Sequence, residues 1–251
     1  MSRQKHIRRL VLSLLASTAI PTSGVALEAS GTAVQVSPAA NAAGPGGDRI
    51  LQAPGDIFQD DLITTDTGGQ AQIRFRDNTR FVVGPNSKVT IDRFVFNPDG
   101  TASDVVFAAV KGTFRFIGGN SNDDAYSIRT PTMTIGIRGT AGDFAVRPGG
   151  MSMVLWHEGL GTSCVVPADA PVGARTPTEC RDLEPGDFLV APPGGGFSEL
   201  RPGEEAVLIN TFLPYAGSDV GLGEDFVLPI DGRPPPPPPP GYTRPPSNYQ
   251  Q

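Results

Sequence analysis

Apolar and polar positions alternate along most of the chain from Arg49 onward. The clearest run is residues 71–76 (Ala-Gln-Ile-Arg-Phe-Arg), where small or apolar residues occupy one face of an extended chain and polar residues the other. A period of two is typical of a strand that buries one face, whereas an amphipathic helix repeats every 3.6 residues. The pattern therefore predicts strands.

Further runs of this kind are separated by short segments rich in glycine, proline, asparagine and aspartate. The runs lie at residues 81–83, 88–92, 105–110, 113–117, 126–128, 132–137, 143–146 and 153–156. One separator is 84–87 (Gly-Pro-Asn-Ser), where proline fixes one φ angle and asparagine tolerates unusual backbone angles. Short strands with frequent turns predict an all-β fold, and they leave open a sandwich, a barrel, a jelly-roll-like arrangement or a β-roll.

The first 26 residues have the character of a signal peptide. A basic start with four arginine or lysine residues precedes an apolar run at 10–20, and the small residues Gly24 and Ala26 follow. The run is shorter than the roughly 20 apolar residues that span a bilayer. We therefore expect cleavage after Ala26 and a periplasmic or secreted protein, with an uncleaved anchor as the alternative.

The charge of the remaining chain argues against polyanionic partners. The signal peptide holds four basic and no acidic residues, so 20 minus 4 leaves 16 basic residues against 26 acidic ones, and the formal net charge falls from −6 to −10. Nucleic acid and anionic lipid repel such a chain. We expect no nucleic-acid partner, and no membrane span after signal cleavage.

The composition suggests five segments. After the signal peptide at 1–26, residues 27–47 are rich in Ala, Gly, Ser and Pro and are predicted to be a linker, although alternation at 33–36 would also allow a first strand. Residues 48–160 are expected to form the main β domain and 161–230 an extension of it.

Within the extension, residues 187–190 are predicted to form a strand. Residues 206–209 favour either another strand or, starting at Glu204, a short helix. The segment at 231–251 is a proline-rich tail with seven consecutive prolines at 234–240, a sequence that adopts polyproline II. It suits either a spacer or docking segment for an aromatic groove, or a solvated end.

Cys164 and Cys180 are the only cysteines. An even pair in an exported protein predicts a disulfide, which would stabilise the fold by about 3 kcal/mol on the chain-entropy account. A metal site would need more ligands nearby. We expect a disulfide, and no metal or cofactor.

Candidate catalytic groups are few. His157 is the only histidine that remains after residue 26, so a Ser-His-Asp or Cys-His mechanism would have to use it. No Gly-x-Ser-x-Gly motif accompanies it, and residues 156–158 are expected at a turn or on the surface. The oxygen-rich segment 120–124 could offer ligands to Ca²⁺, but it lacks EF-hand spacing and is typical of a turn. We expect no enzyme.

Several blocks, taken in order over residues 50–147, resemble the FecR domain. They lie at residues 55–56, 61–65, 69, 71–79, 84–92, 111–116, 126–132 and 135–140. The resemblance implies a β domain in the bacterial periplasm. Some family members are transmembrane regulators that sense an outer-membrane transporter and control a sigma factor from the cytoplasm. Only nine residues precede Leu10, so we expect a stand-alone exported module that lacks the anti-sigma segment.

One part of the later blocks singles out candidate site residues. Gly136 and Gly139 bracket Ile137 and Arg138, where a bulge or tight bend would need backbone freedom. We expect Arg138 to point inward against a carboxylate such as that of Asp143, or else to meet an anionic ligand. Thr130 and Thr132, just upstream, belong with Arg138 to the same possible binding or structural motif.

Two functions remain open from the sequence. The leading hypothesis is a non-catalytic interaction or sensory module of the bacterial envelope, which binds a protein partner or an envelope polymer such as a cell-wall component. The alternative is a small-ligand sensor, or an envelope enzyme that acts on carbohydrate with carboxylates in a cleft. The oligomeric state is left open.

Overall fold

The computed structural model describes residues 27–167 and 176–216. Within these ranges the fold is all-β, as predicted, with one 3₁₀ turn and one α-helix. The elements are β1 Gly31–Ser37, β2 Ala40–Ala43, β3 Arg49–Leu51, β4 Gly55–Ile57, β5 Leu62–Thr65, β6 Gln70–Phe75, β7 Arg80–Val83, β8 Lys88–Phe96, β9 Ala102–Ile117, η1 Asp123–Ala125, β10 Tyr126–Arg129, β11 Met133–Val146, β12 Ser152–Val165, β13 Glu179–Leu183, β14 Phe188–Ala191 and α1 Glu204–Phe212. The expected signal peptide and proline-rich tail lie outside the described residues.

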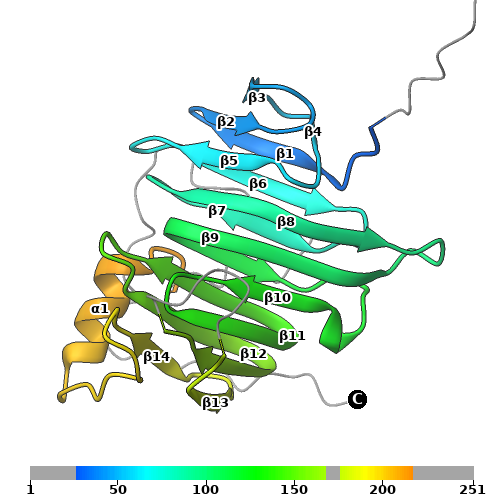
Figure 1. Ribbon diagram of the computed structural model, residues 1–251. Helices are drawn as coiled ribbons and strands as arrows, with labels where there is room; N and C mark the ends of the chain where they lie inside the picture. The colour runs from blue at the N-terminus through cyan, green and yellow to red at the C-terminus, as the bar shows by residue number, and fades with distance from the viewer. Residues whose placement is uncertain (1–26, 168–175, 217–251) are drawn as a thin grey trace, which may run out of the picture.

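The long strand β9 divides the sheet into two branches. Its first part pairs with β8 and β10, and its second part, from Gly112, pairs with β7 and β11. From β9 one branch continues through β8, β5, β2 and β3, and the other through β7, β6, β1 and β4. Figure 1 shows these strands stacked along the molecule, with β9 near the middle.

The two branches face each other across a hydrophobic core. Phe75 of β6 stacks on Phe94 of β8 with ring centroids 5.1 Å apart, and Phe81 of β7 stacks on Phe107 of β9 at 4.5 Å. These aromatic pairs belong to the same buried cluster, which also contains Ile63 of β5. The fold is therefore a β-roll, in which one sheet bends over to form two packed layers.

The predicted linker at 27–47 is wrong, because this segment contributes two strands to the sheet; the strand allowed at 33–36 is found within β1. β1 pairs with β4 and β6, and β2 pairs with β3 and β5. Ala33, Ala40 and Ala42 are fully buried or nearly so. The segment buries small side chains, and its backbone N–H and C=O groups form hydrogen bonds with the neighbouring strands. A scarcity of large apolar residues is therefore compatible with strands in this segment.

The extension after residue 160 continues the same sheet. The expected boundary falls inside β12, and β13 and β14 both pair with that strand. The predicted strand at 187–190 is found as β14, and of the two alternatives for 204–209 the helix is correct. The predicted disulfide is confirmed: Cys164 and Cys180 occupy directly opposite positions on β12 and β13.

A second, smaller core lies on the outer face of the roll, the face opposite the main core. There Ala145, Met153 and Leu155 pack against Leu213 and the apolar side of α1. In Figure 1, α1 is drawn in orange beside β14. The chain around α1 thus covers part of the outer face that strand alternation would leave to solvent.

The sheet ends in strands that are poor templates for further pairing. β3 and β4 have three residues each, and β13 carries three charged side chains. Short and charged edges discourage edge-to-edge association. In the ranges 27–167 and 176–216, no helix combines the length and hydropathy needed to cross a bilayer.

Candidate functional site

Three polar side chains lie side by side on the outer face: Arg115 of β9, Asp143 of β11 and His157 of β12. Successive residues of a strand point to opposite faces, so their chain neighbours enter the main core. Those buried neighbours are Phe114, Phe116, Phe144 and Trp156. The alternation of the three strands therefore gathers one cation, one carboxylate and one imidazole at one place.

Arg115 and Asp143 form a bidentate ion pair. They are register partners on β9 and β11, with Arg115 Nε 2.7 Å from Asp143 Oδ1 and Arg115 Nη2 2.8 Å from Oδ2. Both side chains are buried. Burial by itself would raise the pKa of Asp143, but the charge and hydrogen bonds of Arg115, with those of His157, hold that pKa below its ordinary value. Asp143 is therefore an ionised carboxylate.

His157 completes the cluster from β12. Its Nε2 lies 2.9 Å from Asp143 Oδ2 and 3.5 Å from Arg115 Nη2, and the residue is buried. The expectation that residues 156–158 form a turn or surface feature is wrong: they lie within β12, and Trp156 is fully buried in the main core. His157 faces the side that the chain after α1 covers.

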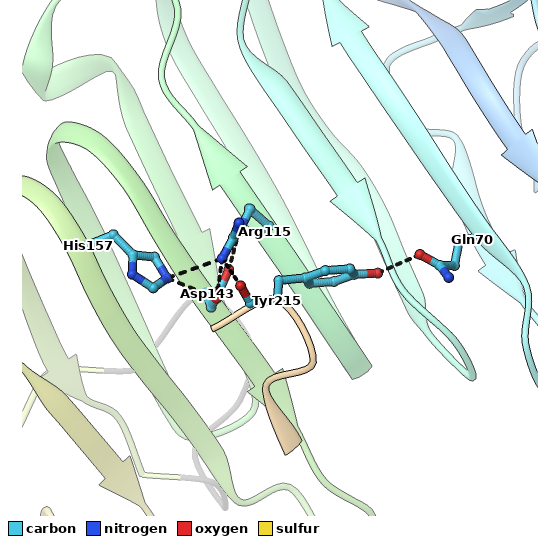
Figure 2. A network of polar contacts seen from close by, with 5 residues as sticks. All are labelled: Gln70, Arg115, Asp143, His157 and Tyr215. Atoms are coloured by element: carbon cyan, nitrogen blue, oxygen red, sulfur yellow. Dashed lines mark hydrogen bonds and ion pairs between the residues drawn. The ribbon is translucent and has the colours of Figure 1, made fainter. Parts of the chain in front are cut away.

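The cluster also holds the chain that follows α1. Arg115 Nη2 donates a hydrogen bond to the backbone carbonyl of Tyr215, and the Tyr215 hydroxyl donates to Gln70 Oε1 of β6 at 2.9 Å. The Tyr215 ring packs on Val82. Burial raises the pKa of Tyr215, so its hydroxyl stays protonated and can donate. Figure 2 shows this chain of contacts, and we call Gln70, Arg115, Asp143, His157 and Tyr215 the outer-face network.

The outer-face network attaches the chain after α1 to the sheet. An Asp–His pair works in hydrolysis when the imidazole can take a proton from a nearby nucleophile. Here the same carboxylate is also neutralised by Arg115, and both cysteines are consumed in the disulfide. Buried charge-assisted hydrogen bonds fix geometry strongly. The network therefore ties four strands to the C-terminal part of the described chain.

The expected inward position of Arg138 is wrong. Its side chain is 64% exposed and lies 3.2 Å from Asp124, which is itself 85% exposed, while Asp143 pairs with Arg115. The pairing of β11 with β12 shifts register between Arg138 and Ala141, which agrees with the bulge expected there. The bulge lies between Arg138 and Asp143. The two residues are close in the sequence, which suggested an ion pair between them, but the shift in register separates them.

Thr130 and Thr132 lie next to each other in the fold but have separate contacts. The Thr130 hydroxyl accepts a hydrogen bond from the Met133 amide at 2.9 Å, which closes the turn before β11. The Thr132 hydroxyl lies 2.8 Å from Ser152 Oγ and 3.0 Å from the Ala191 carbonyl. Both threonines are buried. These contacts link β11, β12 and β14 and give the two residues a structural role, and a binding role stays a prediction.

A second buried carboxylate organises the oxygen-rich segment 120–124. Asp77 is fully buried and accepts hydrogen bonds from Ser121 Oγ at 2.6 Å and from the Tyr126 hydroxyl at 2.8 Å. Burial raises the pKa of Tyr126, which keeps its hydroxyl as a donor. Over the described ranges, no group of three or more histidine, cysteine, aspartate or glutamate residues is placed to hold a metal ion.

Comparisons with known proteins bear on the fold and the family. None of the curated proteins matches the chain. Two crystal structures of a proposed anti-sigma factor from Parabacteroides distasonis ATCC 8503 are similar. One has 12% sequence identity, 62% of this chain covered and a TM-score of 0.44, and the other 13%, 60% and 0.43. The chain spans 64% of each solved protein, which is less than two thirds of its length.

The family comparison is more informative. Residues 61–159 match the family described as FecR protein, and this span runs from just before β5 into β12. It contains most of the sequence blocks on which the resemblance rests, and it includes four of the five members of the outer-face network. Residues 61–159 of this chain are therefore similar to the FecR family.

Proposed function

We propose that this protein is a non-catalytic interaction module of the bacterial envelope, periplasmic or secreted, which binds a protein partner. The FecR domain supports a regulatory or sensory role rather than an enzymatic one. The Cys164–Cys180 disulfide suits an oxidising compartment, because disulfides persist in the periplasm and outside the cell.

The observation that carries this proposal is that the outer-face network is buried and holds the chain after α1. The groups most capable of acid–base chemistry, Asp143 and His157, are buried together with Arg115, and Arg115 binds the Tyr215 carbonyl. In this structure their burial leaves these groups little contact with solvent. The network instead fixes the point from which the chain continues to residues 217–251, so the β domain serves as a rigid carrier.

In this account the recognition elements are the surface of the β domain and the proline-rich segment. Seven consecutive prolines at 234–240 are the kind of sequence that docks in aromatic grooves of partner proteins. The anchored Tyr215 would keep this segment attached to the domain at a defined place. The two elements could act together, since linked binding sites gain affinity by effective concentration.

A crosslinking pull-down from periplasmic and envelope fractions tests the proposal. The bait is the chain from Leu27 to Gln251, compared with a chain that ends at Ala216 and so retains the outer-face network. A protein captured by the long chain alone assigns docking to residues 217–251. A protein captured by both assigns it to the β domain. Specific capture by neither chain would contradict the proposed function.

A further inference from the structure

A shallow hollow lies where the start of β1 meets the end of β6. It has a volume of about 550 Å³ and is open to solvent. We call it the β1–β6 hollow; it is lined by Ala29, Gly31, Thr32, Arg74, Phe75, Arg76 and Asn78. Its only charged lining residues are two arginines, so it is unlike the carboxylate-lined cleft that a carbohydrate-acting enzyme would need.

Arg74 is one of two exposed arginines of the hollow. It lies directly opposite Arg80 in the pairing of β6 with β7, so both side chains project from the same face. Like charges at directly opposite positions destabilise a sheet. Among the described residues, Arg74 makes no side-chain hydrogen bond or ion pair, whereas Arg80 has an interaction of its own.

Arg76 is held in place beside it. Its guanidinium lies 3.9 Å from the centroid of the Phe96 ring and forms an ion pair with Glu28, whose side chain is 76% exposed. Stacking on an aromatic ring orients a guanidinium and leaves its N–H groups directed sideways. An exposed partner such as Glu28 is easily exchanged for another carboxylate.

Most of the arginines that the structure describes outside the hollow are paired with a carboxylate, although Arg147 and Arg201 are not. Six arginines outside the hollow each form an ion pair with a carboxylate; they are Arg49, Arg93, Arg115, Arg129, Arg138 and Arg181. The chain after residue 26 has ten more acidic than basic residues, 26 against 16, so carboxylates are plentiful. Arg74, which has no carboxylate partner among the described residues, is available to a carboxylate supplied from outside.

We propose that the β1–β6 hollow binds an acidic segment of a partner protein, with Arg74 and Arg76 contacting its carboxylates. The planar guanidinium matches a carboxylate in a two-point hydrogen bond. A short segment fits better than a membrane surface, because the net charge of −10 repels an extended anionic surface and leaves only local attraction. This inference rests on the proposed function and names the chemistry of the partner.

Fluorescence anisotropy with the chain from Leu27 to Gln251 tests the assignment. The probe is a labelled short peptide rich in glutamate, and its control has glutamine at every glutamate position. We expect the glutamate peptide alone to bind, with an affinity that falls as salt rises. Arg74→Glu should weaken binding about fivefold or more, because it removes one ion pair and adds repulsion.

Arg201→Glu is the matched control. Arg201 is exposed, lies just before α1 outside the hollow and changes the net charge by the same amount. Equal weakening by both variants would overturn the inference, because it would reduce the effect to overall charge. Circular dichroism of each variant verifies that the β fold is retained.

Two further outcomes separate this inference from the proposed function. Arg74-dependent binding to vesicles of anionic phospholipid, without binding to the glutamate peptide, would overturn the acidic-segment assignment. Failure of the peptide to bind, alongside capture of an envelope protein that Arg74→Glu leaves unchanged, would remove the hollow as the recognition site while the interaction role stands.

Discussion

Arg115 and Asp143 face each other on neighbouring strands and form a buried bidentate ion pair that also reaches the backbone of Tyr215. One side chain, Arg115, therefore joins the β-roll to the chain that covers it. The arrangement explains why a histidine and an aspartate can lie within hydrogen-bond distance in this fold and still serve attachment.

Replacing Asp143 by asparagine should be strongly destabilising. The substitution keeps the shape but leaves the buried Arg115 without its counter-charge, and breaking a buried pair in this way costs about 3–5 kcal/mol. Urea denaturation measures the free energy of unfolding. Asp104→Asn, which removes the exposed ion pair with Arg93, is the control and should have a much smaller effect. Equal losses in the two variants would contradict the account.

The same carboxylate should make stability sensitive to acid. The pKa of Asp143 is lower in the folded protein than its ordinary value, so its contribution is complete above the unfolded pKa of about 3.9 and is lost as pH falls through the lower folded pKa. Unfolding free energy measured from neutral to acidic pH should fall less steeply for Asp143→Asn than for the wild type. If the unfolding free energies of the two proteins fell in parallel with pH, the pKa of Asp143 would not be lowered in the folded protein.

Gly142 should tolerate no side chain. A Cβ at this position of β11 would lie 2.8 Å from Trp156 Cε3, and the ring is fully buried and cannot retreat. Gly142→Ala should destabilise by about 1–3 kcal/mol through overpacking. Gly136→Ala is the matched control on the same strand, because apart from its chain neighbours the nearest heavy atom to a Cβ there would be the Thr162 carbonyl oxygen, at 3.9 Å. Thermal or urea unfolding compares the two.

The disulfide should stabilise the folded protein by closing the loop between Cys164 and Cys180. Cys164 and Cys180 are 16 positions apart, and a loop of this size predicts a loss of about 3 kcal/mol when both become serine. Amide exchange should rise in β13 more than in β9, because β13 pairs with β12 alone. A double serine variant as stable as the wild type would show that strand pairing alone holds β13.

Strand alternation was sufficient to predict the all-β class and several strand positions, because those strands bury one face. Alternation failed where small residues are buried. Ala40 and Ala42 pack in the core, but their small side chains led to the prediction of a linker. It also failed on the outer face. Alternation places Arg115 and His157 on the outer face, where solvent exposure would be expected. They are buried because the chain around Tyr215, which is distant in sequence, covers them.

The hollow shows a related limit. Arg74 and Arg80 are six residues apart and their facing positions follow from the register of β6 with β7, which the sequence alone did not specify. Arg138, in contrast, attracted attention through its flanking glycines, but the bulge after it leaves it exposed beside Asp124. The register of strand pairing, rather than the residue type, determines which arginine lines the hollow and which pairs with a neighbouring carboxylate.

The most direct test of the central claim is hydrogen exchange of residues 198–216 in Tyr215→Ala. Removing the ring and hydroxyl takes away the contacts with Val82 and Gln70, so the account predicts faster exchange across α1 while β9 and β11 keep their protection. Thr211→Ala, an exposed change on α1, should leave β9, β11 and the chain at Tyr215 unchanged. Unaltered protection of α1 in Tyr215→Ala would contradict the claim that the outer-face network anchors this chain.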